Sequence, residues 1–312
     1  MKGVVTLGET MMVLGSPTVG PLRHATHLEL GIAGAESNVA IGVSRLGVPA
    51  RWLGRVGDDE PGRLITSVLR GEGVDTRAVV DPEAATGLML KARRTTGATT
   101  VSYYRSGSAG SRLSPADVDR ALFADAAVLH LTGITPGLSE SCAAAVTAAA
   151  DLAKDVGLAI SVDINYRSRL WSASAAAAVL APLVARADII FAGPEEAALL
   201  VGPNADPLTA LAALGPGEVI LKLGSLGCRG LIDGELHEMP AYPVDAVDPV
   251  GAGDAFSAGY LAARCRGLEP AERLRVAAAT GAFAVTSSSD WQAGPSWDEL
   301  SMVGGEDGLV LR

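Results

Sequence analysis

Residues 248–256 read Asp248-Pro249-Val250-Gly251-Ala252-Gly253-Asp254-Ala255-Phe256, and an alanine-rich helical pattern continues from there to Cys265. The small residues before Asp254 let the backbone N–H groups of a helix N-terminus approach an anion closely, and the helix dipole favours that anion. Asp254 is unexpected in such a place, since a carboxylate repels phosphate. Its position suits a base that takes a proton from an acceptor hydroxyl while the backbone donors hold a phosphoryl group.

The same pattern has a purely structural alternative, in which Asp254 only caps the helix. The tetrapeptide alone leaves these two interpretations equally open. The helix dipole is expected to lower the pKa of Asp254 and make it a weak base. A weak base suits a loose transition state that needs little early proton removal.

The rest of the chain alternates between strand and helix patterns. Apolar runs predict buried strands at Val4–Leu7, Arg51–Val56, Ala126–Leu131, Leu158–Ile164, Asp188–Ala192 and Glu218–Leu223. Amphipathic stretches predict helices at Glu36–Leu46, Arg63–Arg70, Leu138–Val156, Ala173–Arg186, Glu195–Val201 and Pro207–Leu214, followed by two long helices at Gly253–Cys265 and Ala271–Thr286. This alternation indicates a doubly wound α/β fold, with a mostly parallel sheet covered on both faces.

Two segments interrupt the alternation. Residues 9–29 contain several glycines and prolines and have no helical period. The runs Gly87–Arg93 and Thr99–Arg105, separated by Thr95-Thr96-Gly97-Ala98, predict a β-hairpin. We expect a small β-sheet lid from about residues 9–31 and 85–107, inserted into a single domain that spans residues 1–312. A pair of plain surface excursions fits the pattern about equally well.

Composition excludes several classes of function. The 312 residues are 48% hydrophobic and 19% charged, with a net charge of −10 and no basic run, which argues against nucleic-acid and anionic-membrane partners. The scattered Cys142, Cys228 and Cys265 predict a reduced, cytoplasmic protein, and the N-terminus has no signal-peptide pattern. The longest apolar stretch, Ala173–Val184, is too short to span a bilayer. The histidines show no metal-ligand spacing, and P-loop, HExxH and GxSxG motifs are absent from the sequence.

The stretch 248–254 resembles the second signature of the ribokinase-like (PfkB-type) carbohydrate kinases. The family's first signature matches Gly31-Ile32-Ala33-Gly34-Ala35-Glu36-Ser37-Asn38-Val39-Ala40. Two motifs about 200 residues apart and in family order are a specific match, and the resemblance covers almost the whole chain. It implies an ATP-dependent kinase with Asp254 as catalytic base. Gly34 is expected to let the sugar lie against the backbone, and Asn38 to hydrogen-bond its hydroxyls.

Within that family, three segments resemble 2-keto-3-deoxygluconate kinases. One is the Ala35-Glu36-Ser37-Asn38 form of the first signature. The second, Asp163-Ile164-Asn165-Tyr166-Arg167 with Leu170-Trp171, places Arg167 to pair with a substrate carboxylate. In the third, Tyr103-Tyr104-Arg105, a strand period of two directs Tyr103 and Arg105 to one face and Tyr104 to the other. Tyr103 is expected to contact the sugar acid, and Arg105 to hold its carboxylate together with Arg167. Asp290 is also expected in the substrate region.

The nucleotide side carries a weaker signal. Lys222-Leu223-Gly224-Ser225-Leu226-Gly227 resembles the family's ATP-contacting loop, although an ordinary strand-end turn fits nearly as well. The resemblance implies that ATP contacts Asn165, Lys222, Gly224, Ser225, Gly227, Gly251, Ala252 and Gly253. Glu196 matches the family's magnesium-linked segment, but Gly193 replaces its asparagine, so Glu196 is expected to act indirectly. Mg²⁺ is implied, held mainly by ATP and waters, and a monovalent-cation requirement stays open.

The expected reaction is transfer of the ATP γ-phosphoryl group to a sugar acid, 2-keto-3-deoxygluconate, in a homodimer or larger assembly joined through the lid. A kinase for a neutral sugar such as fructose or ribose is the alternative, and a non-catalytic sugar-binding protein on the same fold is a third. The intact Asp254 and its flanking glycines count against the third.

Overall fold

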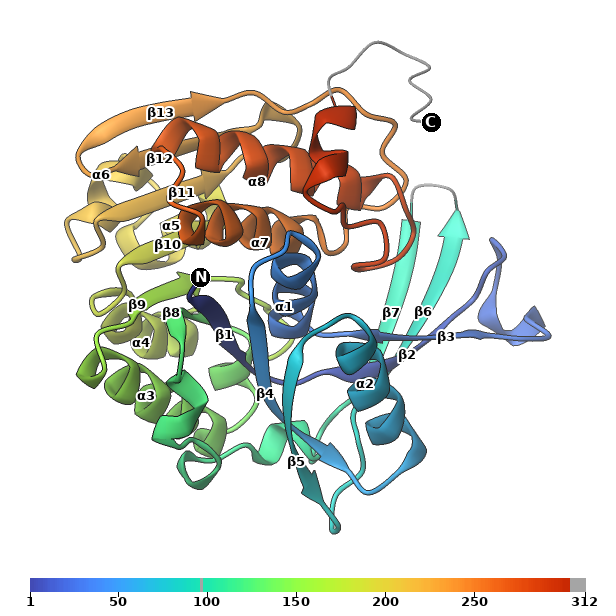
Figure 1. The fold of residues 1–312 in the computed structure, drawn as a ribbon. Coiled ribbons are helices and arrows are strands. Elements are labelled where there is room, and N and C mark those ends of the chain that lie inside the picture. Colours follow the sequence, from blue (N-terminus) through green and yellow to red (C-terminus); the bar gives the residue numbers. More distant parts are fainter. Residues whose placement is uncertain (96–97, 304–312) are drawn as a thin grey trace.

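The computed structural model describes residues 1–95 and 98–303, which form a large twisted sheet flanked by helices and a small second sheet (Figure 1). In these residues the large sheet has nine strands in the order β13-β12-β11-β10-β9-β8-β1-β4-β5. Their bounds are β1 Gly3–Leu7, β4 Ala50–Gly57, β5 Asp75–Asp81, β8 Ala126–Thr132, β9 Ala159–Asp163, β10 Ile189–Ala192, β11 Glu218–Lys222, β12 Cys228–Ile232 and β13 Glu235–Met239.

The strands from β11 to β5 pair in parallel, and β12 and β13 add an antiparallel edge. The doubly wound, mostly parallel fold predicted from the alternating pattern is therefore confirmed. Three strands were not predicted. The edge strand β5 has only three consecutive apolar residues between polar ends, and the short β12–β13 hairpin turns at Asp233 and Gly234, both with positive φ. The Asp-Gly pair was a hairpin signal that the sequence offered.

Helices cover both faces of the large sheet. Their bounds are α1 Ala35–Arg45, α2 Glu60–Gly71, α3 Glu140–Asp155, α4 Ala173–Val184, α5 Pro194–Val201, α6 Pro207–Ala212, α7 Ala252–Cys265 and α8 Pro270–Val285. Helices α1, α2, α7 and α8 bury side chains in one core, and α3 to α6 do so in the core on the opposite face. In the part of the chain that the structure describes, no helix is both long and apolar enough to cross a membrane. Cys142, Cys228 and Cys265 are free thiols.

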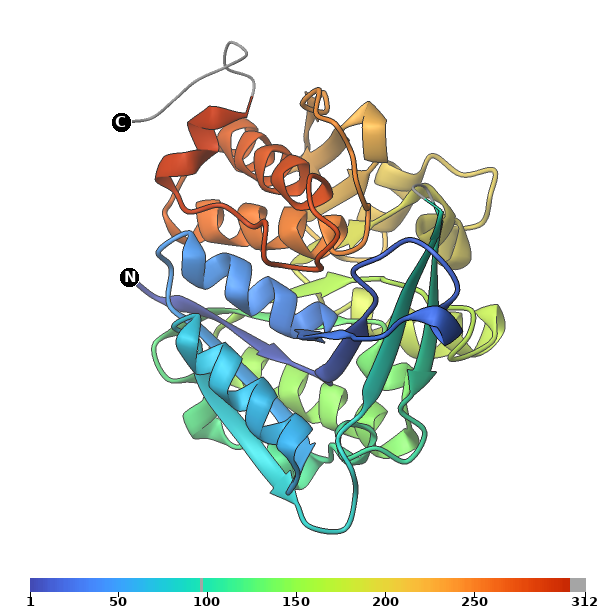
Figure 2. The same ribbon diagram turned by 90° about the vertical axis from the view of Figure 1, so that its right-hand side faces the viewer.

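The small sheet has the order β3-β2-β6-β7 within the described residues and stands beside the main body (Figure 2). Its strands are β2 Met11–Gly15, β3 Glu29–Ala33, β6 Leu88–Thr95 and β7 Ala98–Tyr104. The predicted hairpin is present as the antiparallel β6–β7 pair, and Thr96 and Gly97 of its predicted turn lie outside the described residues. Met11, Ala33 and Met89 form a small apolar cluster on the face toward the main body.

Candidate active site

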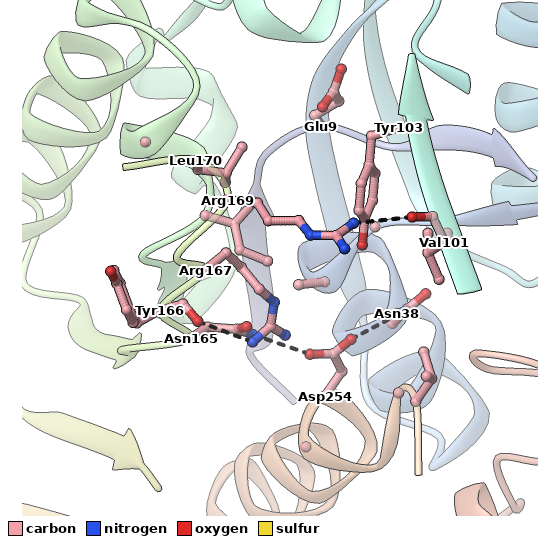
Figure 3. Close-up of a pocket in the computed structure, with 18 of the residues that line it drawn as sticks. Glu9, Asn38, Val101, Tyr103, Asn165, Tyr166, Arg167, Arg169, Leu170 and Asp254 are labelled. Atoms are coloured by element: carbon pink, nitrogen blue, oxygen red, sulfur yellow. Dashed lines mark hydrogen bonds between the residues drawn. The ribbon is translucent and has the colours of Figure 1, made fainter. Parts of the chain in front are cut away.

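A cavity of about 1390 Å³ lies between the small sheet and the carboxyl edge of the large sheet. Parallel sheets place the residues that follow their strands at one edge, where ligands of open α/β folds bind. Glu9 follows β1, Asn165 follows β9, and Lys222 ends β11, and all three line this cavity. The N-terminus of α7 and the inner face of the small sheet close it from the other sides (Figure 3).

Asp254 lies in the first turn of α7 with 9% of its surface exposed. Its Oδ2 accepts a hydrogen bond from Asn38 Nδ2 at 2.8 Å, and its Oδ1 accepts one from Asn165 Nδ2 at 3.5 Å (Figure 3). The N-cap of α7 is Gly251, and no side chain caps the helix by a hydrogen bond. The side chain of Asp254 is therefore held toward the cavity by amides from two other elements, and the helix-capping alternative does not describe it.

The predicted lowering of the pKa of Asp254 is wrong in direction. Burial raises the pKa to about 7, and the nearby Asp163 carboxylate adds to the rise. The hydrogen bond from Asn38 and the charges of Lys222 and Arg167 oppose it without cancelling it. The helix dipole was a local argument, whereas the dominant effect is desolvation by parts of the chain far away in the sequence. A carboxylate with a pKa near neutrality is a stronger base than the sequence suggested.

Gly251, the N-cap residue of α7, fixes how the chain enters that helix. Gly251 has φ +81°, and a Cβ there would lie 2.0 Å from the carbonyl oxygen of Asp290. Only glycine fits this close approach in the left-handed region. The backbone of residues 249–253 thus packs directly on the segment that follows α8, which sets the direction of the α7 N-terminus.

The first signature spans the end of β3, the N-cap Gly34 and the first half of α1. Asn38 is buried in the cavity wall and contacts Asp254 as described above. Gly34 also lines the cavity, but a Cβ there would lie 2.4 Å from the carbonyl oxygen of Glu9, so close backbone packing alone requires glycine. Glu36 points away from the sugar site and accepts hydrogen bonds from Thr132 Oγ1 at 2.7 Å and Thr135 Oγ1 at 2.6 Å.

A second charged group, partly buried, lies next to Asp254. Lys222 Nζ is 2.6 Å from Asp163 Oδ2, and it would be 3.4 Å from a Cβ built on Gly253. Burial opposes the charge of Lys222, but Asp163 and Glu196 outweigh burial, and the pKa of Lys222 is raised. The site therefore places the positive charge of Lys222 beside the N-terminus of α7. An anionic group bound there would contact both the ammonium and the backbone N–H groups of the helix.

Glu196 does not provide an open metal ligand. Its Oε2 accepts a hydrogen bond from Gly193 N at 2.7 Å, and its Oε1 accepts one from Tyr166 N at 3.0 Å. Burial raises its pKa, and Asp163 adds to the rise. Within residues 1–95 and 98–303, no three or more His, Cys, Asp or Glu side chains are grouped so that they could hold a metal ion. The residues present thus do not form a protein-built magnesium site.

The two arginines predicted to bind a substrate carboxylate differ in their contacts. Arg167 lines the cavity, is exposed, and donates to the carbonyl of Tyr166 at 3.3 Å. Arg105 also lines the cavity, but its Nε donates to Glu9 Oε2 at 2.7 Å and its guanidinium stacks on Tyr103, 5.7 Å from the ring centroid. Tyr103 and Arg105 face the cavity, in agreement with the strand period. The structure thus brings both arginines to one cavity, and it pairs Arg105 with Glu9.

Sequence reasoning missed several cavity residues, among them Glu9, Lys91 and Arg169. Glu9 directly follows the first strand, where site residues of such folds gather, and that was the available signal. Lys91 shares a face of its strand with Met89, which strand alternation predicts. Arg169 Nη1 donates to the carbonyl of Val101 at 3.1 Å and links the loop after β9 to the small sheet (Figure 3). No local pattern distinguishes Arg169 from an ordinary surface arginine.

Two of the predicted groups have contacts that sequence reasoning did not foresee. Asp290 lines the cavity, but its Oδ1 accepts from Lys91 Nζ at 3.0 Å. Gly224 and Ser225 form an exposed turn after β11, and a Cβ on Gly227 would lie 2.1 Å from the carbonyl oxygen of Met239. These loop residues follow β11 at the same edge of the sheet, outside the lining of the cavity.

A buried carboxylate in the first turn of a helix, beside a partly buried lysine and at the carboxyl edge of a doubly wound sheet, fits a phosphotransferase of the α/β class. Comparison with known proteins agrees. Residues 1–295 match the model of the pfkB family carbohydrate kinases. The chain belongs to this family.

Relatives and solved structures extend the match over the whole chain. A 2-dehydro-3-deoxygluconokinase of Thermoproteus tenax is 38% identical over 304 residues, which cover 95% of this chain and 92% of that protein. A 2-dehydro-3-deoxygalactonokinase of Haloferax volcanii is 33% identical over 314 residues, with 98% of each chain covered. A protein from Escherichia coli assigned as a ribokinase II, solved in complex with ATP and Mg²⁺, superimposes with a TM-score of 0.89 at 29% identity and covers 97% and 98% of the two chains.

Proposed function

We propose that this carbohydrate kinase transfers the γ-phosphoryl group of ATP to 2-keto-3-deoxygluconate, also called 2-dehydro-3-deoxygluconate, and forms 2-keto-3-deoxy-6-phosphogluconate. The observation that carries the acceptor is the pair formed by a base and a guanidinium in one cavity. Asp254 lies at the α7 N-terminus, and the exposed Arg167 lines the same cavity. A sugar acid spans these two groups, with its primary hydroxyl at Asp254 and its carboxylate at Arg167.

In the proposed reaction, Asp254 takes the proton of the acceptor hydroxyl as that oxygen attacks the γ-phosphorus. Asn38 and Asn165 orient the side-chain carboxylate of Asp254. The backbone of residues 251–253 and the ammonium of Lys222 offset the charge that moves with the phosphoryl group. Mg²⁺ bound to ATP would offset the charge of the phosphates, and within the described residues no group of three or more His, Cys, Asp or Glu side chains would hold it directly.

Arg105 takes a different part from the one that the sequence suggested. Because Arg105 already pairs with Glu9, we assign the direct carboxylate contact to Arg167 and expect Arg105 to support Tyr103 on the cavity wall. The ring of Tyr103 then offers its hydroxyl to a polyhydroxylated acceptor.

We also infer a homodimer joined through the outer face of the small sheet. That face carries Leu14, Leu30, Leu88, Leu90 and Tyr104, which share two rows of the strand register. Leu30 and Tyr104 are 62% and 61% exposed, which is costly for large apolar side chains in one patch. A two-fold axis covers the patch with a second copy of itself.

The acceptor is tested by ATP consumption with purified protein over a panel of sugars and sugar acids. The panel includes 2-keto-3-deoxygluconate, its galactonate epimer, gluconate, fructose and ribose. We expect kcat/KM to be highest for a 2-keto-3-deoxy sugar acid and lower by about tenfold or more for the neutral sugars, which leave the carboxylate partner unfilled. A preference for fructose or ribose would overturn the acceptor proposal and keep the kinase. No turnover with any acceptor would favour a non-catalytic binding protein.

A further inference from the structure

A buried lysine from the small sheet lies inside a cage of oxygens next to the active-site loop. Lys91, on β6, is 7% exposed. Its Nζ donates hydrogen bonds to the carbonyl of Ser288 and to Asp290 Oδ1, both at 3.0 Å. A third oxygen, Asp248 Oδ2, is also 3.0 Å away as an ion pair. In the part of the chain that the structure describes, that oxygen has no hydrogen-bond partner, so charge alone ties it to the ammonium.

These oxygens come from the two segments that shape the entry to α7. Asp248 opens the loop and accepts through Oδ1 from Val250 N at 3.1 Å. Its neighbour Val247 donates its N–H to the carbonyl of Val285, at the end of α8. Asp290 follows α8, and its backbone leaves no room for a Cβ on Gly251. One ammonium therefore holds the loop 248–251 and the segment 288–290 against each other.

The cage needs a cation. Two carboxylates with 6% and 10% of their side chains exposed repel each other when no positive charge lies between them. Burial raises the pKa of Asp290, and the charge of Lys91 opposes that rise. Burial also opposes the charge on Lys91, but Asp290 and Asp248 outweigh it, and the pKa of Lys91 is raised. Lys91 therefore carries its positive charge at neutral pH.

We propose that the ammonium of Lys91 is a built-in monovalent cation that holds the loop before α7 in its catalytic conformation, so that the wild-type protein needs no added monovalent cation. An ammonium group is close in size to K⁺ and binds oxygen at similar distances. Removal of the lysine charge leaves a cage of carboxylate and carbonyl oxygens that K⁺ or NH₄⁺ fits. Lys91 is a positioning residue, since it acts on Asp254 only through the loop. The activity part of this proposal rests on the proposed kinase function.

The test uses Lys91→Met, which keeps the apolar stem and removes the charged end. Lys154→Met, at an exposed position on α3, is the matched control. Turnover is measured while KCl or NH₄Cl replaces tetramethylammonium chloride at constant ionic strength. We expect wild type and the control to be indifferent to the exchange. Lys91→Met should lose about tenfold or more of kcat in tetramethylammonium, since a small shift of the loop misplaces the base. K⁺ or NH₄⁺ should restore it saturably.

A second readout does not depend on activity. A cation that binds only the folded variant raises its Tm by mass action. KCl should therefore raise the Tm of Lys91→Met above its value in tetramethylammonium chloride and leave the Tm of wild type unchanged. Lys91→Met/Asp290→Asn, which removes one carboxylate of the cage, should lose most of this response. If Lys91→Met does not fold, Lys91→Gln, which keeps a donor without a charge, takes its place in both measurements.

Three results would overturn the proposal. They are activation of the wild type by K⁺, full kcat of Lys91→Met in tetramethylammonium, and a defect that no cation relieves in either kcat or Tm. If instead the wild type phosphorylates no acceptor, the proposed function fails, and the Tm measurements alone still decide whether Lys91 takes the place of a cation.

Discussion

At Asp254, burial and nearby charges act in opposite directions on one carboxyl group. Burial and Asp163 raise its pKa, while the amide of Asn38 and the cations Lys222 and Arg167 lower it, with a net value of about 7. The base form is therefore present above about pH 7. The same raised pKa makes the protonated form of Asp254 the one that stabilises the fold, because the folded protein holds this proton more tightly than the unfolded chain. The contribution is full below the ordinary value of 3.8 and is lost as pH rises through 7.

Asp254→Asn tests the base. We expect kcat to fall by about 10²–10⁴, because the amide cannot take the proton of the acceptor. ATP binding, measured by calorimetry, should persist, and Tm at neutral pH should not fall, since a buried charge is replaced by a neutral group of the same shape. A loss of less than about tenfold in kcat would place the base elsewhere.

The pH dependence tests the environment of the same residue. With both substrates limiting, kcat/KM should rise with pH and level off above about 7, because the carboxylate is the active form. Asn38→Ala removes a hydrogen bond that lowers the pKa, so its profile should shift to higher pH. His130, the buried histidine near the site, has a pKa lowered by burial to about 4 and does not produce this limb. A profile that is flat from pH 5 to 8 would contradict the raised pKa.

Arg167→Leu tests the carboxylate contact. Loss of a charged hydrogen-bond partner costs about 2–5 kcal/mol, and roughly 30-fold or more in the KM for the sugar acid. The KM for ATP should change little. Arg63→Leu, which removes an exposed arginine on α2, is the control, because surface pairs such as Arg63–Asp58 contribute little. An equal rise in the KM for ATP would show that Arg167 serves the nucleotide.

At the scale of the element, the small sheet contacts the main body through few polar links. Arg169 reaches the carbonyl of Val101 on β7, Arg105 reaches Glu9 beside β1, and Lys91 reaches the loop before α7. These links lie along the cavity wall. The sheet is therefore placed to close over a bound sugar acid and exclude water, which would limit wasteful hydrolysis of ATP.

Hydrogen exchange measures that closure. We expect the amides of β6 and β7 to exchange more slowly when the sugar acid and a non-hydrolysable ATP analogue are both bound. The strands β9 and β10, in the centre of the large sheet, provide the internal control and should not change. Unchanged exchange in β6 and β7 would make the small sheet a static wall of the cavity.

At the scale of the whole molecule, the homodimer proposed through the outer face of the small sheet can be tested by mass. Light scattering should give a mass of twice 31.7 kDa at micromolar concentration. Tyr104→Asp places a charge within the proposed interface and should return the mass to that of one chain. Activity should fall with it, because the sheet loses its support. A wild-type mass near 31.7 kDa would end the dimer proposal.

The sequence determined the layers of this protein and the position of the proposed base, Asp254, at the start of a helix. Strands and helices can be predicted from the local period of apolar residues, because that period is set by residues close together in the sequence. The predicted strands and helices therefore agree with the structure to within a few residues, as at Val4–Leu7 against Gly3–Leu7. The missed β5 and the β12–β13 hairpin lie at the sheet edges, where polar residues weaken that period.

Tertiary structure alone decided the electrostatics of the site. Asn38 and Asp254 are 216 residues apart, Lys91 and Asp290 are 199 apart, and Arg105 and Glu9 are 96 apart. The pKa of Asp254, the pairing of Arg105 and the cage around Lys91 all depend on such distant partners. Desolvation and charge act through space, so a motif can show which residue is acidic and cannot show which groups will surround it.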